Sequence, residues 1–305
     1  MKKIYVMLSS YNGEKYISEQ INSILNQRNV TVELAIRDDG SSDRTVEIIK
    51  KITDRNECVH LIEGNNVGFR RSFYSLLLDA PEDCDYYAFS DQDDFWEPMK
   101  LGAAVEALEG AGEHVKMYAS GLKVVDQDLN YQYLNSFSGI RISYGSALSR
   151  QRLAGCTMVF SPGLLKLCKK FRITEEMGNL FSHDAAVYYI CLACGGKVVF
   201  EPNSYIQFRR HKGTVTERGK GYWKRIKSVL NVFNKFRDRR YNQAKLLLET
   251  YREYMPEEIR MYSLKLTRYR DSLINTLSLL IDKRVRCGIV SVDVTNAIAI
   301  ITQRY

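Results

Sequence analysis

Short apolar segments alternate with helical patterns over the first hundred residues, and this alternation constrains the fold more than any other feature. The apolar segments lie at residues 4–8, 32–36, 59–62 and 86–90. Apolar side chains recur at helical spacing over residues 14–26, 43–52 and 71–78. The second of these helices is expected to take its N-cap from Ser41 or Ser42. Strands that alternate with helices predict an α/β fold with a mostly parallel sheet covered on both faces.

Polar residues follow three of these expected strands directly. The clusters occupy residues 9–13, 37–41 and 90–94. Ligands of open parallel sheets bind at the carboxyl ends of the strands. We therefore expect the three clusters to converge on one site.

The rest of the chain predicts further strands and helices around one long loop. Helices are expected at residues 97–108, 162–171, 242–255 and 256–283, with another that opens at residues 182–186, and strands at 115–125, 197–200 and 204–209. Residues 126–150 lack periodicity and are expected to form a mobile loop, whereas residues 291–305 fit a helix or a strand equally well.

Three carboxylates crowd the end of the fourth expected strand. Asp91, Asp93 and Asp94 lie between an aromatic strand and the pair Phe95 and Trp96. Carboxylates this close repel one another unless a proton or a cation separates them, and a hard divalent ion suits oxygen ligands. From these residues alone, a solvated acidic turn and a phosphoaspartate nucleophile remain open beside a metal site.

The charge of the chain is unevenly distributed. Residues 209–305 hold 22 Lys and Arg against 9 Asp and Glu, whereas residues 1–208 hold 22 against 27. The basic stretch 220–240 is interleaved with aromatic residues such as Trp223 and Phe233, which favours an anionic membrane surface over a merely solvated helix face. We do not expect a nucleic-acid partner, because the acidic clusters upstream have the wrong chemistry.

The cysteines and the apolar runs bear on the location of the protein. Seven cysteines, an odd number without framework spacing, predict reduced thiols in a cytoplasmic setting, and Cys191 and Cys194 are expected to pack in a helix. No run approaches the roughly 20 apolar residues of a spanning helix. We expect a cytoplasmic protein, with peripheral contact to the inner face of the cell membrane.

Six motifs occur in a fixed order along residues 1–215. They read Ser-Ser-Tyr-Asn-Gly-Glu-Lys-Tyr, Arg-Asp-Asp-Gly-Ser-Ser-Asp-Arg-Thr, Asn-Asn-Val-Gly-Phe, Ser-Asp-Gln-Asp-Asp-Phe-Trp, Ser-His-Asp and Arg-Arg-His-Lys. In this order and spacing they resemble the family 2 glycosyltransferases of GT-A fold, especially the branch that includes bacterial rhamnosyltransferases. The resemblance implies a nucleotide-sugar-binding and catalytic domain over residues 1–215. The resemblance does not extend to the tail after residue 219. The basic, amphipathic pattern of residues 216–305 instead predicts a helical region for membrane association or for pairing in a homodimer.

The resemblance also implies an activity and its residues. The reaction would be an inverting, metal-dependent transfer of a sugar, rhamnose among the candidates, from a dTDP- or UDP-sugar to a hydroxyl of a glycan or lipid-linked glycan during synthesis of a bacterial surface polysaccharide. Asp184 matches the general base. The nucleotide would be bound by Ser9, Tyr11, Asp38, Asp39, Asp91 and Gln92. Mg²⁺ or Mn²⁺ would be held by Asp93 and His211, with Asp91. The acceptor would contact Asp94, Trp96, Cys156, Thr157 and His183.

Two alternatives from other classes remain at this stage. A nucleotidyltransferase acting on sugar phosphates also places acidic metal sites at strand ends, but its nucleophile attacks phosphorus. A non-catalytic nucleotide-sugar-binding protein would need the same binding loops without a base.

Overall fold

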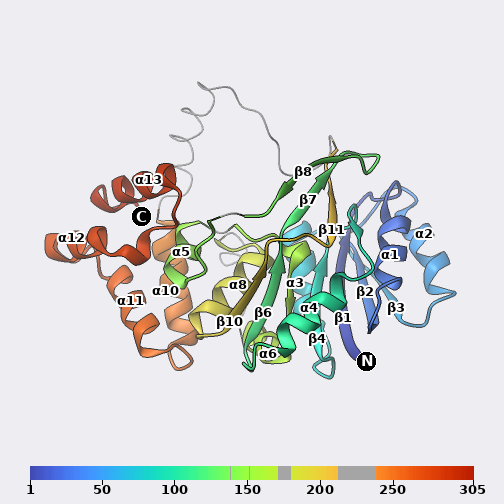
Figure 1. Ribbon diagram of the computed structural model, residues 1–305, viewed down its shortest axis with the longest axis horizontal. Helices are drawn as coiled ribbons and strands as arrows, with labels where there is room; N and C mark the ends of the chain where they lie inside the picture. Colours follow the sequence, from blue (N-terminus) through green and yellow to red (C-terminus); the bar gives the residue numbers. More distant parts are fainter. Residues whose placement is uncertain (138, 151, 171–179, 212–237) are drawn as a thin grey trace. The chain divides into compact units, whose positions relative to one another are not determined.

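The computed structural model describes residues 1–137, 139–150, 152–170, 180–211 and 238–305 (Figure 1). The chain forms two compact units. The first contains residues 1–138, 153–191 and 196–210, and the second contains residues 139–152, 192–195 and 211–305. Residues 139–152 therefore belong to the second unit, although they precede the expected domain boundary at residue 215. That boundary itself, and most of the basic stretch 220–240, lie outside the described residues.

A seven-stranded sheet forms the centre of the first unit, and its strand order is β10-β6-β9-β4-β1-β2-β3. Its strands are β1 (Lys2–Ser10), β2 (Val30–Asp38), β3 (Val59–Glu63), β4 (Tyr86–Ser90), β6 (Lys116–Ser120), β9 (Val159–Phe160) and β10 (Lys197–Glu201). Only β9 runs antiparallel to its neighbours, and the other pairs in this sheet are parallel. The predicted α/β fold with a mostly parallel sheet is thus confirmed.

Helices lie on both sides of this sheet (Figure 1). They are α1 (Ile17–Leu25), α2 (Thr45–Thr53), α3 (Phe69–Asp79), α4 (Lys100–Glu109), α6 (Pro162–Lys170) and α8 (His183–Ala193). Ile17, Ile21 and Ile24 of α1 are fully buried, as their helical spacing predicts. Each of these helices overlaps a segment that the sequence predicted to be helical.

The predicted N-cap of α2 is wrong. The helix begins at Thr45, its N-cap residue is Arg44, and no side chain caps it there. Ser41 is used elsewhere, because its Oγ donates to the Asp38 carboxylate at 2.5 Å. The carboxylate of Asp43 instead accepts from the Thr45 backbone N–H at 3.0 Å.

A second sheet of four strands, in the order β5-β11-β7-β8, completes the first unit. Its strands are β5 (Phe95–Trp96), β11 (Ile206–Arg209), β7 (Leu122–Val125) and β8 (Tyr131–Asn135). The single strand predicted over residues 115–125 is divided at Gly121 between the two sheets. A Cβ at Gly121 would lie 2.3 Å from the Pro202 carbonyl oxygen, so only glycine fits where the chain changes sheet.

The second unit is helical, as predicted for the C-terminal region. Its elements are α5 (Tyr144–Ser149), α10 (Arg239–Tyr251), α11 (Glu257–Thr267), α12 (Leu273–Ile281), the 3₁₀ turn η2 (Lys283–Val285) and α13 (Val290–Ile301). Four almost fully buried tyrosines dominate its core, namely Tyr251, Tyr262, Tyr269 and Tyr305. None of the helices in the described part of the chain is both long and apolar enough to cross a membrane.

Two predictions for these regions are corrected. The segment 126–150 is not an irregular loop, because β8 pairs with β7 and α5 packs in the second unit. The helix predicted over residues 256–283 is two helices, since α11 ends at Thr267 and the Ser272 side chain accepts from the Asn275 N–H to cap the start of α12. The ambiguous segment 291–305 is mainly the helix α13.

Candidate active site

The loops that follow β1, β2 and β4 meet at one edge of the main sheet. These strands are neighbours, with Ser10 opposite Asp38 and Leu8 opposite Ser90. The backbone N–H of Tyr11 donates to Gln92 Oε1 at 2.8 Å, and Gln92 Nε2 donates back to the Tyr11 carbonyl at 3.0 Å. This reciprocal pair joins two of the loops, and the predicted convergence of the polar clusters is confirmed.

The carboxylate of Asp38, which is almost fully buried, organises its own loop. It accepts from the backbone N–H groups of Gly40 and Ser41 and from the hydroxyls of Ser10 and Ser41. An aspartate that bonds the backbone two and three residues ahead stabilises a tight turn. Asp38 therefore has a structural role, and its predicted contact with the nucleoside stays a prediction.

Asp39 connects the end of β2 to the start of α3. Its buried carboxylate accepts from the backbone N–H groups of Val67 and Gly68 at 2.9 and 2.8 Å and from the Arg37 guanidinium at 2.5 Å.

Two further predicted nucleotide contacts lie on the neighbouring strand β1 and its loop. The Tyr11 ring is 46% exposed. It is therefore available to stack on a flat ligand. Ser9 is less available, because its Oγ donates to Ser72 Oγ at 2.6 Å.

Asp91, Asp94 and Cys156 come together beyond the end of β4. One side-chain ligand atom of each lies within 4.8 Å of the other two. Burial, and then the charges of Asp93 and Asp184, raise the pKa of Asp91 to about 7. Burial, followed by the charges of Asp91 and Asp93, also raises the pKa of Asp94 well above its usual range. The site thus concentrates negative charge that it does not neutralise by itself.

These residues fit a hard divalent cation. Asp94 Oδ2 is buried and finds no hydrogen-bond donor among the described residues. Carboxylate oxygens suit Mg²⁺ and Mn²⁺, whereas burial and the nearby carboxylates raise the pKa of the Cys156 thiol and so disfavour the thiolate that a metal would require. Asp91 and Asp94 are therefore the ligands that the geometry favours. The group does not include Asp93, and His211 belongs to the second unit, so their roles as ligands stay predictions.

A buried lysine, which the sequence analysis missed, lies beneath the carboxylates. Lys100 Nζ is 3.5 Å from the centre of the Trp96 ring and has no hydrogen-bond partner in the part of the chain that is described. Burial lowers the pKa of Lys100 to about 7, although Cys156 and Asp94 act in the opposite direction. No sequence pattern signals this residue, because a lysine in the first turn of an amphipathic helix is normally solvated.

Arg209 at the end of β11 holds the acidic turn in place. Its backbone N–H donates to Asp94 Oδ1 at 3.2 Å, and its Nε donates to the Asp93 carbonyl at 2.9 Å. Its guanidinium also contacts the Gln127 carbonyl and the Glu19 carboxylate. Arg209 was part of the Arg-Arg-His-Lys motif, yet only the histidine of that motif had been assigned a role.

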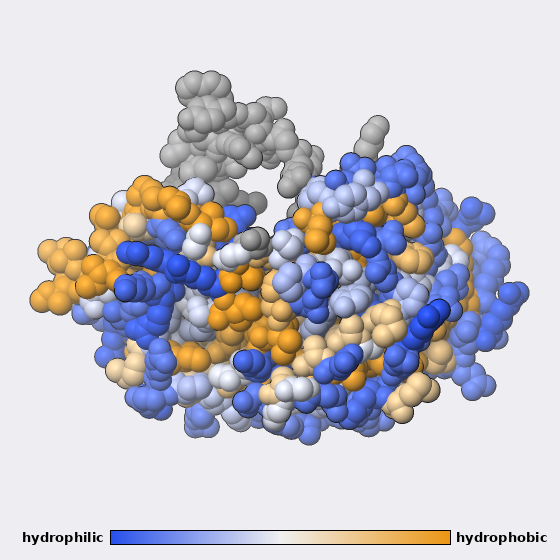
Figure 2. All heavy atoms as spheres, viewed as in Figure 1, coloured by the Kyte–Doolittle hydropathy of each residue, from blue (hydrophilic) through white to orange (hydrophobic). Residues whose placement is uncertain are grey.

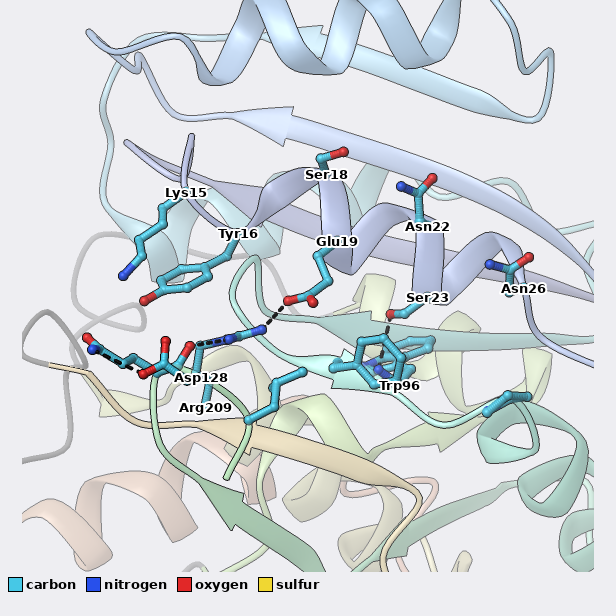
Figure 3. Close-up of a pocket in the computed structure, with 14 residues that line it drawn as sticks. Lys15, Tyr16, Ser18, Glu19, Asn22, Ser23, Asn26, Trp96, Asp128 and Arg209 are labelled. Carbon is cyan, nitrogen blue, oxygen red and sulfur yellow. Dashed lines mark hydrogen bonds and ion pairs between the residues drawn. The ribbon is translucent and has the colours of Figure 1, made fainter. Parts of the chain in front are cut away.

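The side chain of Arg209 lies along a pocket of about 800 Å³ between α1 and the second sheet (Figure 3). Figure 3 shows its guanidinium directed at Glu19 of α1, with Tyr16 and Lys15 on the same side. The ring of Tyr16 lies 4.4 Å from the guanidinium carbon. Neither Asp91 nor Asp184 lines this pocket, so it is separate from the buried carboxylates.

The candidate base, Asp184, is the second residue of α8 and is half-buried. One of its carboxylate oxygens accepts from the Ala185 N–H at 2.8 Å, and its charge contributes to the raised pKa of Asp91. The turn η1 (Gly155–Thr157) packs tightly against it. A Cβ at Gly155 would lie 3.0 Å from both Asp184 Cβ and His183 Nε2.

His183 is packed among aromatic rings. Its ring stacks on Phe73 with centroids 3.9 Å apart and meets Phe89 edge-on at 4.7 Å. Burial lowers the pKa of His183 to about 4, so the imidazole is neutral at physiological pH. This neutral ring supports the start of α8 next to Asp184.

The residues expected to contact the acceptor share one property that the sequence did not reveal. All five are at most 6% exposed, namely Asp94, Trp96, Cys156, Thr157 and His183. Their burial favours a structural role around the carboxylates, and an acceptor contact by any of them stays a prediction. Tyr11 is the predicted site residue that is clearly exposed, and Asp184 is half-buried.

The chemistry of this arrangement is specific. A half-buried carboxylate at a helix start, Asp184, lies near the half-buried Asp91 and the buried Asp94, which suit a divalent cation. A cation of this kind stabilises a phosphorylated leaving group, and a nearby carboxylate can remove a proton from an attacking hydroxyl.

Comparison with known proteins agrees with this chemistry. The family described as "Glycosyl transferase family 2" matches residues 5–170. The "dTDP-rhamnosyl transferase RfbG" of Shigella flexneri is 26% identical over 245 residues, which cover 75% of this chain and 80% of that protein.

Two solved structures are similar in fold. The crystal structure of S. aureus TarS in complex with UDP-GlcNAc superposes with a TM-score of 0.59 at 16% identity, covering 96% of this chain and 83% of that one. The mannosyltransferase PcManGT of Pyrobaculum calidifontis, in complex with GDP-Man and Mn²⁺, superposes with a TM-score of 0.54 at 16% identity, covering 99% and 88% of the two chains. Because the family match spans more than half of the sequence, the chain belongs to glycosyl transferase family 2 and is a glycosyltransferase of GT-A fold.

Proposed function

We propose that this glycosyltransferase moves a sugar from a dTDP- or UDP-sugar to an acceptor hydroxyl in one inverting displacement that depends on Mg²⁺ or Mn²⁺. The observation that carries the proposal is the position of Asp184 at the start of α8. Its side chain packs against Gly155, and the next residue, Cys156, lies with Asp91 and Asp94 in the group that suits a cation. The candidate base and the candidate cation site are therefore joined by one short turn.

The roles of the residues follow from this arrangement. Asp91 and Asp94 would hold the cation, which neutralises the departing diphosphate. Tyr11, exposed beside the Asp39 loop, would stack on the base of the nucleotide. Asp184 would take the proton of the acceptor hydroxyl while its oxygen forms a bond to the anomeric carbon and the bond to the diphosphate breaks. A single displacement from the opposite face inverts the configuration at that carbon.

The donor and the acceptor are proposed from the relatives. The similarity to a dTDP-rhamnosyl transferase favours dTDP-rhamnose as donor, and the corresponding setting is synthesis of a bacterial surface polysaccharide on a glycan or lipid-linked glycan. Thermal stabilisation by dTDP-, UDP- and GDP-sugars, each with and without Mn²⁺, would rank the donors. Stabilisation by GDP-sugars alone would contradict the proposed donor class.

Replacement of Asp184 by Asn tests the assignment of the base. Loss of a general base typically slows the chemical step by about 10²- to 10⁴-fold, so kcat should fall by that order while nucleotide binding is retained. Asp79→Asn, at the exposed end of α3, is the matched control and should keep full activity. A fully active Asp184→Asn enzyme would refute the assignment.

The metal ligands are tested by Asp93→Asn and Asp94→Asn, compared one against the other. Affinity for UDP or dTDP, measured with and without Mn²⁺, should lose its metal dependence in the Asp94 variant and keep it in the Asp93 variant. The reverse result would support the ligand set expected from the sequence. Unchanged metal dependence in both variants would argue against a cation at this turn.

A further inference from the structure

Helices α12 and α13 expose a continuous set of apolar side chains. The outer face of α12–α13 consists of Leu273, Ile274, Leu277, Ile281, Val290, Val294, Ile298 and Ile301, each between 48% and 79% exposed. Figure 2 shows apolar side chains gathered over these two helices. Single exposed apolar residues are ordinary, whereas a set of eight on two adjoining helices marks an interaction surface.

The fold of the second unit does not account for this surface. The two helices pack together, and each already buries another side, with Leu279 inward on α12 and Ile300 inward on α13. On α13 the exposed residues Val290, Val294 and Ile298 recur every four positions, as a helix stripe made for contact does. Both sides of these helices therefore carry apolar residues, and the contacts among the described residues of the unit use only one side.

Charges are absent from the outer face and positive beside it. α12 contains no charged residue, and α13 contains only Asp293, whose carboxylate accepts from the Cys287 N–H at 2.8 Å. Segment 268–286 holds five basic residues and two acidic ones. Among the basic residues, Lys283 and Arg286, on the connection between the two helices, are exposed.

This combination fits one partner. A surface between two copies of the chain would need only the apolar side chains, and the cations at its edge would repel those of the second copy. An anionic bilayer accepts both, because apolar side chains enter the boundary between headgroups and acyl chains while Lys and Arg bind lipid phosphates. With 9 and 12 residues, the helices span roughly 14 and 18 Å, so they would lie in the plane of the interface.

We propose that the outer face of α12–α13 binds the surface of an anionic lipid membrane, with Lys283 and Arg286 on the headgroup phosphates. This proposal does not depend on the transferase reaction. It places membrane contact on described helices, in addition to the basic stretch 220–240 that the sequence had singled out.

Flotation of the full chain with lipid vesicles tests the proposal. The protein should float with vesicles of phosphatidylcholine and phosphatidylglycerol, and much less with phosphatidylcholine alone or at high salt. The variant Leu277→Ser/Ile281→Ser/Val294→Ser should lose vesicle binding by at least about a hundredfold, because three apolar side chains no longer leave water. Lys283→Gln/Arg286→Gln should lose roughly thirtyfold, and only for anionic vesicles.

The flotation experiment has a matched control variant, and two outcomes would contradict the proposal. Tyr131→Ser/Leu134→Ser removes exposed apolar side chains from β8 in the first unit and should float like the parent protein. Unchanged flotation of the triple variant would overturn the proposal. A second result would also overturn it: the parent protein does not bind vesicles and is a dimer by light scattering, whereas the triple variant is a monomer. The outer face would then be an interface between two copies of the chain. Transfer to a soluble acceptor should be equal in all these proteins, which separates this outcome from failure of the proposed reaction.

Discussion

The acidic turn of the first unit and the outer face of α12–α13 depart from the usual distribution of side chains in opposite directions. At the acidic turn the chain buries the carboxylate of Asp94 and the lysine Lys100, whereas α12 and α13 leave leucines, isoleucines and valines in contact with water. Burying charge costs free energy unless partners compensate, and exposing apolar surface forgoes the gain from burial. Both departures support the proposed roles, binding of a charged ligand at the acidic turn and of a membrane surface at the outer face.

The two regions also differ in the contacts that stabilise them. The acidic turn is fixed by long-range hydrogen bonds, above all those of Arg209, which joins residues about 190 and 115 positions away in the sequence. The outer face needs no such support, because none of the described residues of its own unit covers it. Substitutions should therefore be costly at the first region and nearly silent for stability at the second.

The largest effect is expected from Arg209→Leu. The change leaves the Asp93 and Gln127 carbonyls without their donor, and we expect a loss of about 3 kcal/mol in the free energy of unfolding together with weaker Mn²⁺-dependent nucleotide binding. Equilibrium urea unfolding measures the first quantity. Glu19→Gln is the control and should cost less than about 1 kcal/mol, because the Glu19 side chain is 44% exposed. Equal losses in the two variants would show that Arg209 stabilises the fold through its ion pair with Glu19 and not through its hydrogen bonds to the acidic turn.

Two substitutions on α12 compare the stability contribution of its buried side with that of its exposed side. Leu279 is fully buried, and Leu279→Ala should cost about 3 kcal/mol in urea unfolding. Leu277 is 58% exposed, and Leu277→Ala should stay within about 0.5 kcal/mol of the parent. Similar losses at both positions in the absence of lipid would mean that the outer face is already covered in solution.

The free energy of unfolding should depend on pH because His183 is buried in its neutral form. The pKa of His183 falls from 6.5 to about 4 on folding, so between these values the unfolded chain binds more protons and stability decreases as the pH falls. The neutral His183 ring contributes about 3 kcal/mol to the free energy of unfolding at neutral pH. Most of this contribution remains at pH 6, and it is lost near pH 4. His183→Phe should remove this part of the dependence in unfolding experiments across that range. The exposed His60→Phe serves as control, and a parent-like pH profile in the His183 variant would contradict the assignment.

The smallest effect is expected from Gly155→Ala. The new Cβ would lie 3.0 Å from Asp184 Cβ and from His183 Nε2, so the base must shift by a few tenths of an ångström. We expect kcat to fall about tenfold, with donor affinity retained. Gly110→Ala, where the nearest atom to the new Cβ is 3.8 Å away, should leave steady-state kinetics unchanged. Full activity of the Gly155 variant would show that α8 tolerates movement at its start.

Much of the first unit was predictable because its signals are local. Isoleucines at helical spacing define α1, apolar runs define β1, β2 and β4, and parallel neighbours necessarily bring their carboxyl ends together. The failures are equally informative. β8 has little apolar alternation and exists because β7 offers it a partner, and Gly121 divides one apolar run between two sheets because of a carbonyl contributed by Pro202.

By itself, the sequence determined the α/β class and the edge of the sheet at which the polar clusters meet, and it singled out the carboxylates there as candidates. The tertiary structure alone decided which of these carboxylates lie together, that Arg209 holds their turn, that Lys100 is buried near Asp94, and that α12 and α13 turn apolar residues outward. The physical reason is that periodicity and strand order are properties of neighbouring residues. Burial, unmet hydrogen bonds and shifted pKa values instead depend on groups that only the folded chain brings together.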